Sequence, residues 1–164
     1  MDQLKNILVA VDFSACSAAA LKQAVRIAAL NRARVSALHV VEIPAYALPE
    51  GSFLPIDLLP PVEILLSASR ERWAQWPAAR EVQRTVAFEC VLGLPRMELL
   101  ERARQGAVDL LVVGAHGDFD AKRGVGSIAG ACVQRAGTKV LVVRDGQTGP
   151  FKSVVACVDF SDTS

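Results

Sequence analysis

The residues best suited to bind a ligand lie in the stretch from Asp109 to Ser127, DLLVVGAHGDFDAKRGVGS. Its apolar first half gives way to a polar loop that contains Gly114, Gly117, Gly124 and Gly126. Because glycine has no Cβ and adopts positive φ readily, such a loop can wrap its backbone N–H groups around an anion. Ser127 then begins a segment with helical spacing and is a suitable N-cap, and a helix N-terminus favours phosphate. The stretch predicts a phosphate-binding loop; the alternative is an ordinary glycine-rich connection from a strand to a helix.

A carboxylate that could complement this loop is Asp12. It follows Asn6 to Val11, NILVAV, a continuous apolar run of strand length. A carboxylate accepts hydrogen bonds, and the hydroxyl groups of a ribose can donate them. Asp12 is therefore a candidate ribose ligand, and its alternative role is that of a cap or turn residue.

The spacing of apolar residues predicts alternating strands and helices that would position both groups. Strands are expected at Asn6 to Val11, Arg34 to Val41, Val82 to Leu92, 109 to 113 and Lys139 to Val143. Helices are expected from a Ser14 cap to about Leu30, from Val62 to Pro77, from Pro95 to Gly106 and from Ser127 to Gly137. In the first helix the predicted polar face carries Lys22, Gln23 and Arg26.

This order of elements predicts an α/β fold with an open, doubly wound, five-stranded parallel sheet. We expect the strand order 3-2-1-4-5 with helices on both faces. Strands 1 and 4 are then neighbours at the point where the strand order reverses, which is where ligands bind in such sheets. Asp12 and the glycine loop should meet in that crevice.

The composition argues against several classes of function. The 164 residues suit one domain, and a formal net charge of +1 lacks the basic excess of a nucleic-acid-binding protein. No apolar run is long enough to span a membrane. Four widely spaced cysteines signal neither a zinc site nor a disulfide framework: Cys16, Cys90, Cys132 and Cys157. We expect a cytoplasmic protein that binds neither nucleic acid nor membrane.

Catalysis is not expected either. The chain has only two histidines, His39 and His116, and no Ser/His/Asp triad or metal cluster can be assembled around them from the sequence. We therefore predict no catalytic residue, no metal site and no enzyme. The pattern of Gly124, Gly126 and Gly130 matches a dinucleotide-binding loop superficially, but it does not directly follow a strand, as that motif requires.

The end of the chain repeats its beginning. FKSVVACVDFSDTS, residues 151–164, overlays LKNILVAVDFSACS, residues 4–17, with Lys, Val, Asp, Phe, Ser and Ser identical. The residues between the copies, RDGQTGP, have the composition of a linker. We interpret the chain as one domain at 1–144, a linker at 145–150 and the truncated start of a second repeat at 151–164.

The chain resembles the universal stress protein (UspA-like) family from Leu4 to Arg144, as the first domain of a tandem member. Three features carry the resemblance: a first strand that ends in Asp, a second strand that reads LHV, and a loop of glycine, two residues, glycine, a spacer, then Gly126-Ser127. The spacer here is 118–125, eight residues, one fewer than in the family pattern. Its acidic pair, Asp118 and Asp120, opposes its basic pair, Lys122 and Arg123.

The resemblance implies a Rossmann-like fold of the nucleotide-binding α-hydrolase type and a regulatory stress-response role that depends on ATP, with or without Mg²⁺. It implies that Asp12 contacts the ribose, the backbone of Ala10 and Val40 the adenine, and Gly114, Gly117, Gly126 and Ser127 the phosphates. His116 could also reach a phosphate, with a solvent-facing position as its alternative. It further implies a homodimer through the fifth strand, or a pseudo-dimer with a second repeat. The competing function is a stress-related dimerisation or scaffold protein of this fold that binds no nucleotide.

Overall fold

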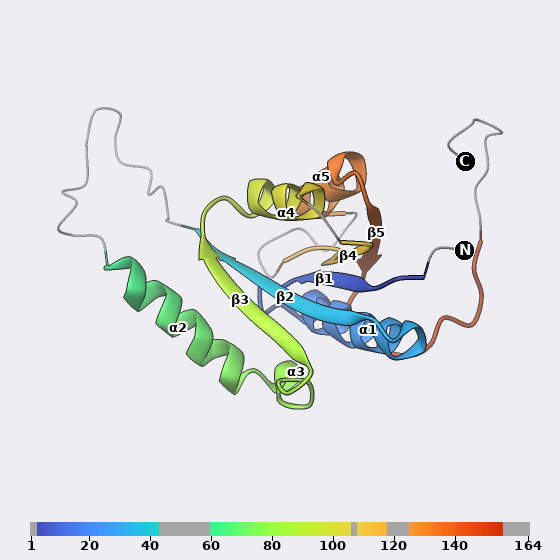
Figure 1. Ribbon diagram of the computed structural model, residues 1–164, viewed down its shortest axis with the longest axis horizontal. Helices are drawn as coiled ribbons and strands as arrows, with labels where there is room; N and C mark the ends of the chain where they lie inside the picture. Colours follow the sequence, from blue (N-terminus) through green and yellow to red (C-terminus); the bar gives the residue numbers. More distant parts are fainter. Residues whose placement is uncertain (1–2, 43–59, 106–107, 118–124, 156–164) are drawn as a thin grey trace.

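A five-stranded parallel sheet forms the centre of the molecule (Figure 1). The computed structural model describes residues 3–42, 60–105, 108–117 and 125–155. The strands lie in the order β3-β2-β1-β4-β5, as predicted. Their bounds are β1 (Asn6–Ala10), β2 (Arg34–Val41), β3 (Val86–Leu92), β4 (Leu110–Gly114) and β5 (Lys139–Val143).

Helices cover both faces of the sheet, which confirms the predicted architecture. They are α1 (Ala15–Asn31), α2 (Val62–Gln75), α3 (Pro77–Arg80), α4 (Pro95–Arg104) and α5 (Ser127–Arg135). Figure 1 shows α1, α2 and α3 on one face and α4 with α5 on the other. Within β1, Ile7 and Val9 pack into the apolar core on the side of α1, α2 and α3. Leu8 packs into the core on the side of α4 and α5. After Asn6 the first strand is apolar, because both of its faces are buried.

Two boundaries differ from the sequence expectation. The third strand begins at Val86 rather than Val82, because the chain first makes turns in which Val82 N–H donates to Ala79 C=O and Thr85 N–H to Val82 C=O. Val82 is apolar and in phase with Val86, so the sequence pattern does not show where the strand begins. The cap of α5 is Gly126, and Ser127 is the first helical residue.

Gln23 was expected on the polar face of the first helix, and that expectation is wrong. Its side chain is only 1% exposed, because the chain after β5 crosses this side of α1. Its Nε2 donates to the carbonyl oxygens of Gln147 and Gly149, both at 2.7 Å. Residues of the predicted linker are thus fastened to the domain.

The turn between β1 and α1 contains a strained residue. Phe13 has φ = 66°, a left-handed conformation that is uncommon for a bulky side chain. Its buried ring contacts the ring of His39 with 4.6 Å between centroids and the edge of Trp76 at 5.4 Å. The Arg72 guanidinium lies over the Phe13 ring, 4.4 Å from its centroid. These contacts hold the turn in a conformation that the backbone alone disfavours.

His39 supports the same turn through its polar edge. Its Nδ1 lies 2.7 Å from Val11 C=O, so Nδ1–H is the donor of this hydrogen bond. Burial lowers the pKa of His39 below its usual 6.5, the hydrogen bond to Val11 partly offsets this, and the charge of Arg72 lowers the pKa further. The imidazole therefore sits neutral under α2 near neutral pH.

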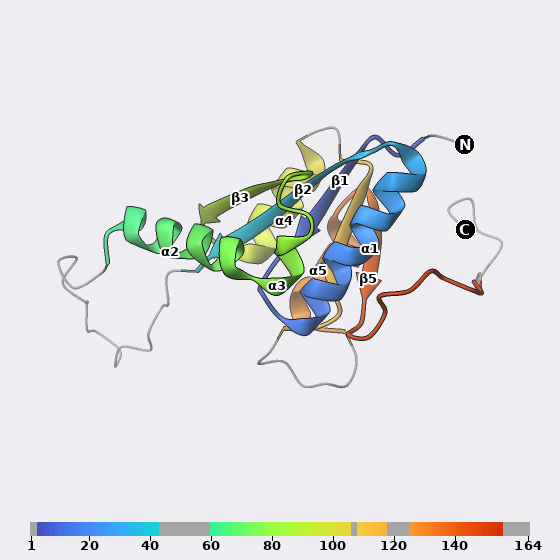
Figure 2. The same ribbon diagram turned by 90° about the horizontal axis from the view of Figure 1, so that it is seen from below.

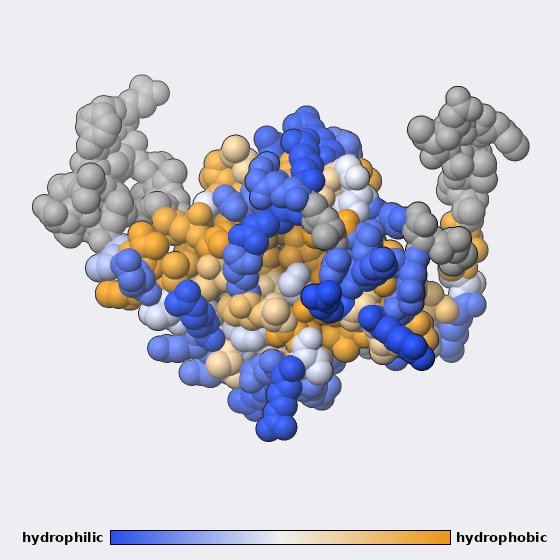
Figure 3. Space-filling model, in the orientation of Figure 1, coloured by the Kyte–Doolittle hydropathy of each residue, from blue (hydrophilic) through white to orange (hydrophobic). Residues whose placement is uncertain are grey.

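Several large apolar side chains are exposed among the described residues. Figure 3 shows apolar surface where α2 and α4 begin, and Ile64, Leu94 and Met97 are more than half exposed in these segments. Of the helices in the described ranges, not one has both the length and the apolar character that crossing a bilayer demands.

Gly114→Ala should lower the free energy of unfolding by about 1–3 kcal/mol, because overpacking strains the neighbouring elements. A Cβ at residue 114 would lie 2.9 Å from Cys16 Cβ and 3.1 Å from the backbone nitrogen of Ser17, neither of which is a flexible chain end. Gly130→Ala is the matched control, since nothing lies within 4 Å of its Cβ position, and a helical alanine should gain about 0.5–1 kcal/mol. Urea unfolding measures both; equal stability of the two variants would contradict the packing constraint.

His39 should make the protein less stable as the pH falls below 6.5. The lowered pKa means that the unfolded chain binds a proton there before the folded chain does, so stability is full above 6.5 and is lost as the pH decreases. In His39→Gln, which retains a donor for Val11 C=O, this contribution disappears. The check is the difference in unfolding free energy between the two proteins from about pH 5 to 8; a difference that stays constant over this range would refute it.

Candidate functional site

The candidate site lies where the order of the strands reverses. β1 pairs in parallel with β4 on one side and with β2 on the other, with Val9 opposite Val112 and Ala10 opposite Leu38. Figure 2 shows that the ends of β1 and β4 and the starts of α1 and α5 gather on the same side of the molecule. The predicted switch point is therefore present, with the helix N-termini around it.

Asp12 and Gly117 meet in this crevice. The Asp12 side chain is exposed, and its Oδ1 accepts a hydrogen bond of 2.9 Å from Ser14 N–H. A Cβ at residue 117 would lie 2.9 Å from Asp12 Oδ2, so the loop backbone passes directly over the carboxylate. Asp12 thus acts as a turn residue through one oxygen and faces the glycine loop with the other. The structure thus shows the turn role of Asp12, and its contact with a ribose stays a prediction.

The end of β4 and the start of α5 are joined by main-chain hydrogen bonds. Ala115 N–H donates to Val143 C=O at 2.8 Å, and Gly126 N–H donates to Ala115 C=O at 2.6 Å. The two ends of the predicted phosphate loop therefore lie side by side. No side chain caps α5 in the described structure, so its first N–H groups, beginning at Ser127, remain suited to an anion.

Gly114 has a packing role in addition to its predicted ligand role. Its backbone lies against the first turn of α1, and the contact leaves no room for a side chain. The glycine is thus explained by close packing of β4 on α1, and a phosphate contact at this position stays a prediction.

Ala10 and Val40, the predicted adenine contacts, lie on neighbouring strands near their carboxyl ends. Val40 is buried and Ala10 half-buried, and both pack on the face of the sheet that α4 and α5 cover. An adenine contact with these residues would use their backbone, as the sequence analysis expects.

His116 lies against the first turn of α1, and its contact with a phosphate stays a prediction. The imidazole is half-buried, and its Nδ1 and Nε2 lie 3.6 and 3.8 Å from Cys16 Sγ, in the first turn of α1. The carboxylate of Asp145, just after β5, belongs to the same group of side chains. This grouping could not be predicted from the sequence, because its members come from three distant segments.

The electrostatics of the site also include residues that the sequence analysis missed. Arg72, on α2, lies beside Phe13, the neighbour of Asp12, and its charge reaches His39. A single arginine on a helix carries no signal of this position, since the contact depends on how α2 packs. Gly124 and the charged residues of the loop, Asp118, Asp120, Lys122 and Arg123, lie outside the described residues.

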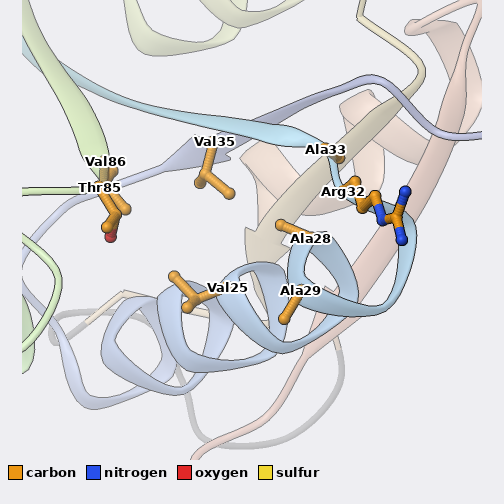
Figure 4. Close-up of a pocket in the computed structure, with 8 residues that line it drawn as sticks. All are labelled: Val25, Ala28, Ala29, Arg32, Ala33, Val35, Thr85 and Val86. Atoms are coloured by element: carbon orange, nitrogen blue, oxygen red, sulfur yellow. The ribbon is translucent and has the colours of Figure 1, made fainter.

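A pocket of about 380 Å³ lies at the opposite end of the sheet (Figure 4). It is formed by the last turns of α1, including Val25 and Ala28, and by the starts of β2 and β3 at Val35 and Val86. Since parallel sheets bind ligands at their carboxyl ends, this pocket is separate from the candidate site.

Comparison with known proteins agrees with this arrangement. The profile of the Universal stress protein family matches residues 3–144. The chain is 31% identical over 144 residues to Universal stress protein A homolog 1 of Coxiella burnetii, covering 85% of this chain and 95% of that protein. It is 33% identical over 144 residues to Universal stress protein MJ0531 of Methanocaldococcus jannaschii, covering 85% and 82% respectively.

Solved structures of universal stress proteins share the fold. The UspA structure from Lactobacillus plantarum superposes with a TM-score of 0.70 at 33% identity and covers 88% of this chain and 100% of its own. Three more distant relatives were solved with ligands. A complex with cAMP has 24% identity and a TM-score of 0.58, and it covers 88% of this chain and 100% of its own. A complex with dAMP from Archaeoglobus fulgidus has 20% identity and a TM-score of 0.51, with coverages of 87% and 99%. A complex with AMP from Arabidopsis thaliana has 16% identity and a TM-score of 0.56, with coverages of 87% and 92%. On the family match over residues 3–144, the identity to these relatives and the shared fold, the chain belongs to the universal stress protein family.

Proposed function

We propose that this chain binds an adenine nucleotide, ATP, in the crevice between the ends of β1 and β4. One observation carries the proposal: the Asp12 carboxylate and the Gly117 backbone face each other across the switch point, where a Cβ at 117 would be 2.9 Å from Asp12 Oδ2. The carboxylate would accept hydrogen bonds from the ribose hydroxyls. The adenine would lie along the backbone of Ala10 and Val40.

The phosphates would lie on the other side of the crevice. Gly126 begins α5 without a side-chain cap, and Ser127 adds a hydroxyl at the first helical position. The positive end of the helix dipole and the uncapped N–H groups favour anionic oxygens there. Mg²⁺ would accompany the phosphates with their oxygens as its ligands, since it takes few protein ligands in such complexes.

The relatives support an adenine nucleotide as the ligand class. Universal stress proteins with this fold were solved in complex with cAMP, dAMP and AMP. Adenine, a five-membered sugar and one phosphate group are the parts that these three ligands share, and the proposed contacts of Ala10, Val40 and Asp12 address the first two. The choice of ATP rests on the phosphate loop.

We assign the nucleotide a regulatory role in the stress response rather than a catalytic one, in a cytoplasmic protein. A carboxylate engaged by Ser14 N–H and by the ribose is not placed as a base for an attacking water. The competing proposal is a scaffold of the same fold without nucleotide. Calorimetric titration with ATP separates the two, because heat of binding at one site per chain is expected only for the first.

We further propose an assembly through β5. Among the described residues this strand lies at the edge of the sheet, next to β4, and it consists of Lys139 followed by four apolar residues. Its outer edge presents N–H and C=O groups that a second strand can pair with. The partner would be β5 of a second copy or, in a tandem protein in which the 151–164 repeat begins another domain, β5 of that domain.

Asp12→Ala should weaken ATP binding by roughly 10- to 150-fold, because hydrogen bonds to a charged acceptor contribute about 1.5–3 kcal/mol. The measurement is isothermal titration calorimetry with ATP.

Asp109→Ala is the matched control for this substitution. Asp109 Oδ2 also accepts main-chain hydrogen bonds, from Lys5 N–H at 2.7 Å and Asn6 N–H at 2.8 Å, but at the opposite end of the sheet. This variant should lose stability and keep its ATP affinity. If wild type and Asp12→Ala bind ATP with equal affinity, Asp12 does not belong to the site. If both variants lose ATP affinity equally, the loss reflects lower stability of the fold and not a lost contact with ATP.

Val142→Lys, in β5, should weaken the dimer by placing charges in the pairing surface. Val133→Lys is the control: Val133 is a 58% exposed apolar residue on α5, outside the strand, and its substitution should leave the dimer intact. Light scattering across a concentration series reports the dissociation constant, and circular dichroism verifies the fold of both variants. A folded Val142→Lys protein that dimerises as wild type does would contradict pairing through β5.

A further inference from the structure

Cys16, His116 and Asp145 form a cluster of three different metal-ligating side chains. One potential ligand atom from each of the three lies within 4.8 Å of the others. They come from the first turn of α1, the residue pair after β4 and the turn after β5. Among the described residues, this is the group of three or more His, Cys, Asp or Glu side chains that could hold one ion.

The distances fit a tetrahedral ion of the zinc type. Bonds of about 2.3 Å to sulfur and about 2.1 Å to nitrogen at a tetrahedral angle place the two ligand atoms about 3.6 Å apart. Cys16 Sγ and His116 Nδ1 are 3.6 Å apart. Asp145 is exposed, so its carboxylate can close the remaining distance by a change of rotamer.

The local charges favour a cation bound through sulfur. Cys16 is in the first turn of α1, where the positive end of the helix dipole favours an anionic ligand atom. The side chain is 2% exposed, so the thiol is not open to a substrate from solvent. His116 is half-buried and Asp145 exposed, and these two leave a path by which an ion can enter.

We propose that Cys16, His116 and Asp145 bind a transition-metal ion of the Zn²⁺ class, with a water molecule as the fourth ligand. The ligand set selects such an ion over Mg²⁺, which prefers oxygen atoms and octahedral geometry. Binding transfers the thiol proton to solvent as the metal–sulfur bond forms. The bound ion ties the first turn of α1 to the residues that follow β4 and β5.

Co²⁺ is the probe, because it replaces Zn²⁺ and reports a thiolate ligand by its absorption. It is added to the full chain without nucleotide, so that the result does not depend on ATP binding. One equivalent should produce a thiolate-to-cobalt charge-transfer band and the visible bands of a tetrahedral ion, and Zn²⁺ should abolish both. Excess Mg²⁺ should change neither.

The variants assign the ligands. Cys16→Ser should eliminate the charge-transfer band, and His116→Gln and Asp145→Asn should each weaken Co²⁺ binding at least about tenfold. Cys90→Ser is the matched control, since it removes a buried thiol outside the cluster, whose Sγ contacts Leu66 C=O. This variant should bind as wild type does.

Three results would overturn the proposal. They are the absence of the band in wild type at stoichiometric Co²⁺, its persistence in Cys16→Ser, and unchanged affinity in both His116→Gln and Asp145→Asn. If Cys16→Ser does not fold, the other two variants decide, because they alter residues nearer the surface.

Discussion

The site depends on the close approach of β4 to the first turn of α1. Gly114 ends β4 so near to Cys16 and Ser17 that a side chain would not fit. Because the strand ends there, Ala115 can bond to the end of β5 on one side and to the start of α5 on the other. The next residues then pass over Asp12. A single missing Cβ thus sets the positions of the carboxylate, the loop and the α5 N-terminus relative to one another.

The crevice is also electrically polar, which gives the proposed ligand one orientation. Asp12 presents a negative oxygen at the end of β1, and α5 begins with uncapped N–H groups beyond the end of β4. A phosphate placed at Asp12 would be repelled, whereas a ribose hydroxyl donates to it. The sugar and the phosphates therefore belong at opposite sides of the crevice, and neutral His39 adds no competing charge beneath it.

Much of the fold could be predicted because the strands are short apolar runs with clear ends. The bounds of β2 and β5 agree with the prediction to the residue, and the strand order brings Asp12 to the glycine loop as expected. Gln23 could not be placed, because its burial depends on a segment that returns from the far end of the chain. The left-handed Phe13 and the grouping of Cys16 with His116 depend in the same way on tertiary packing, for which local periodicity carries no signal.

The hydrogen bonds of Gln23 change where the chain leaves the domain. With Gln147 and Gly149 both held by its amide, the segment after β5 runs along α1 before it departs (Figure 2). The pivot for anything that follows is then near Pro150 and not at the end of β5. The flexible part of the connection is therefore shorter than the full predicted linker. A domain attached after it would sample a smaller volume, and its effective concentration near α1 would be higher.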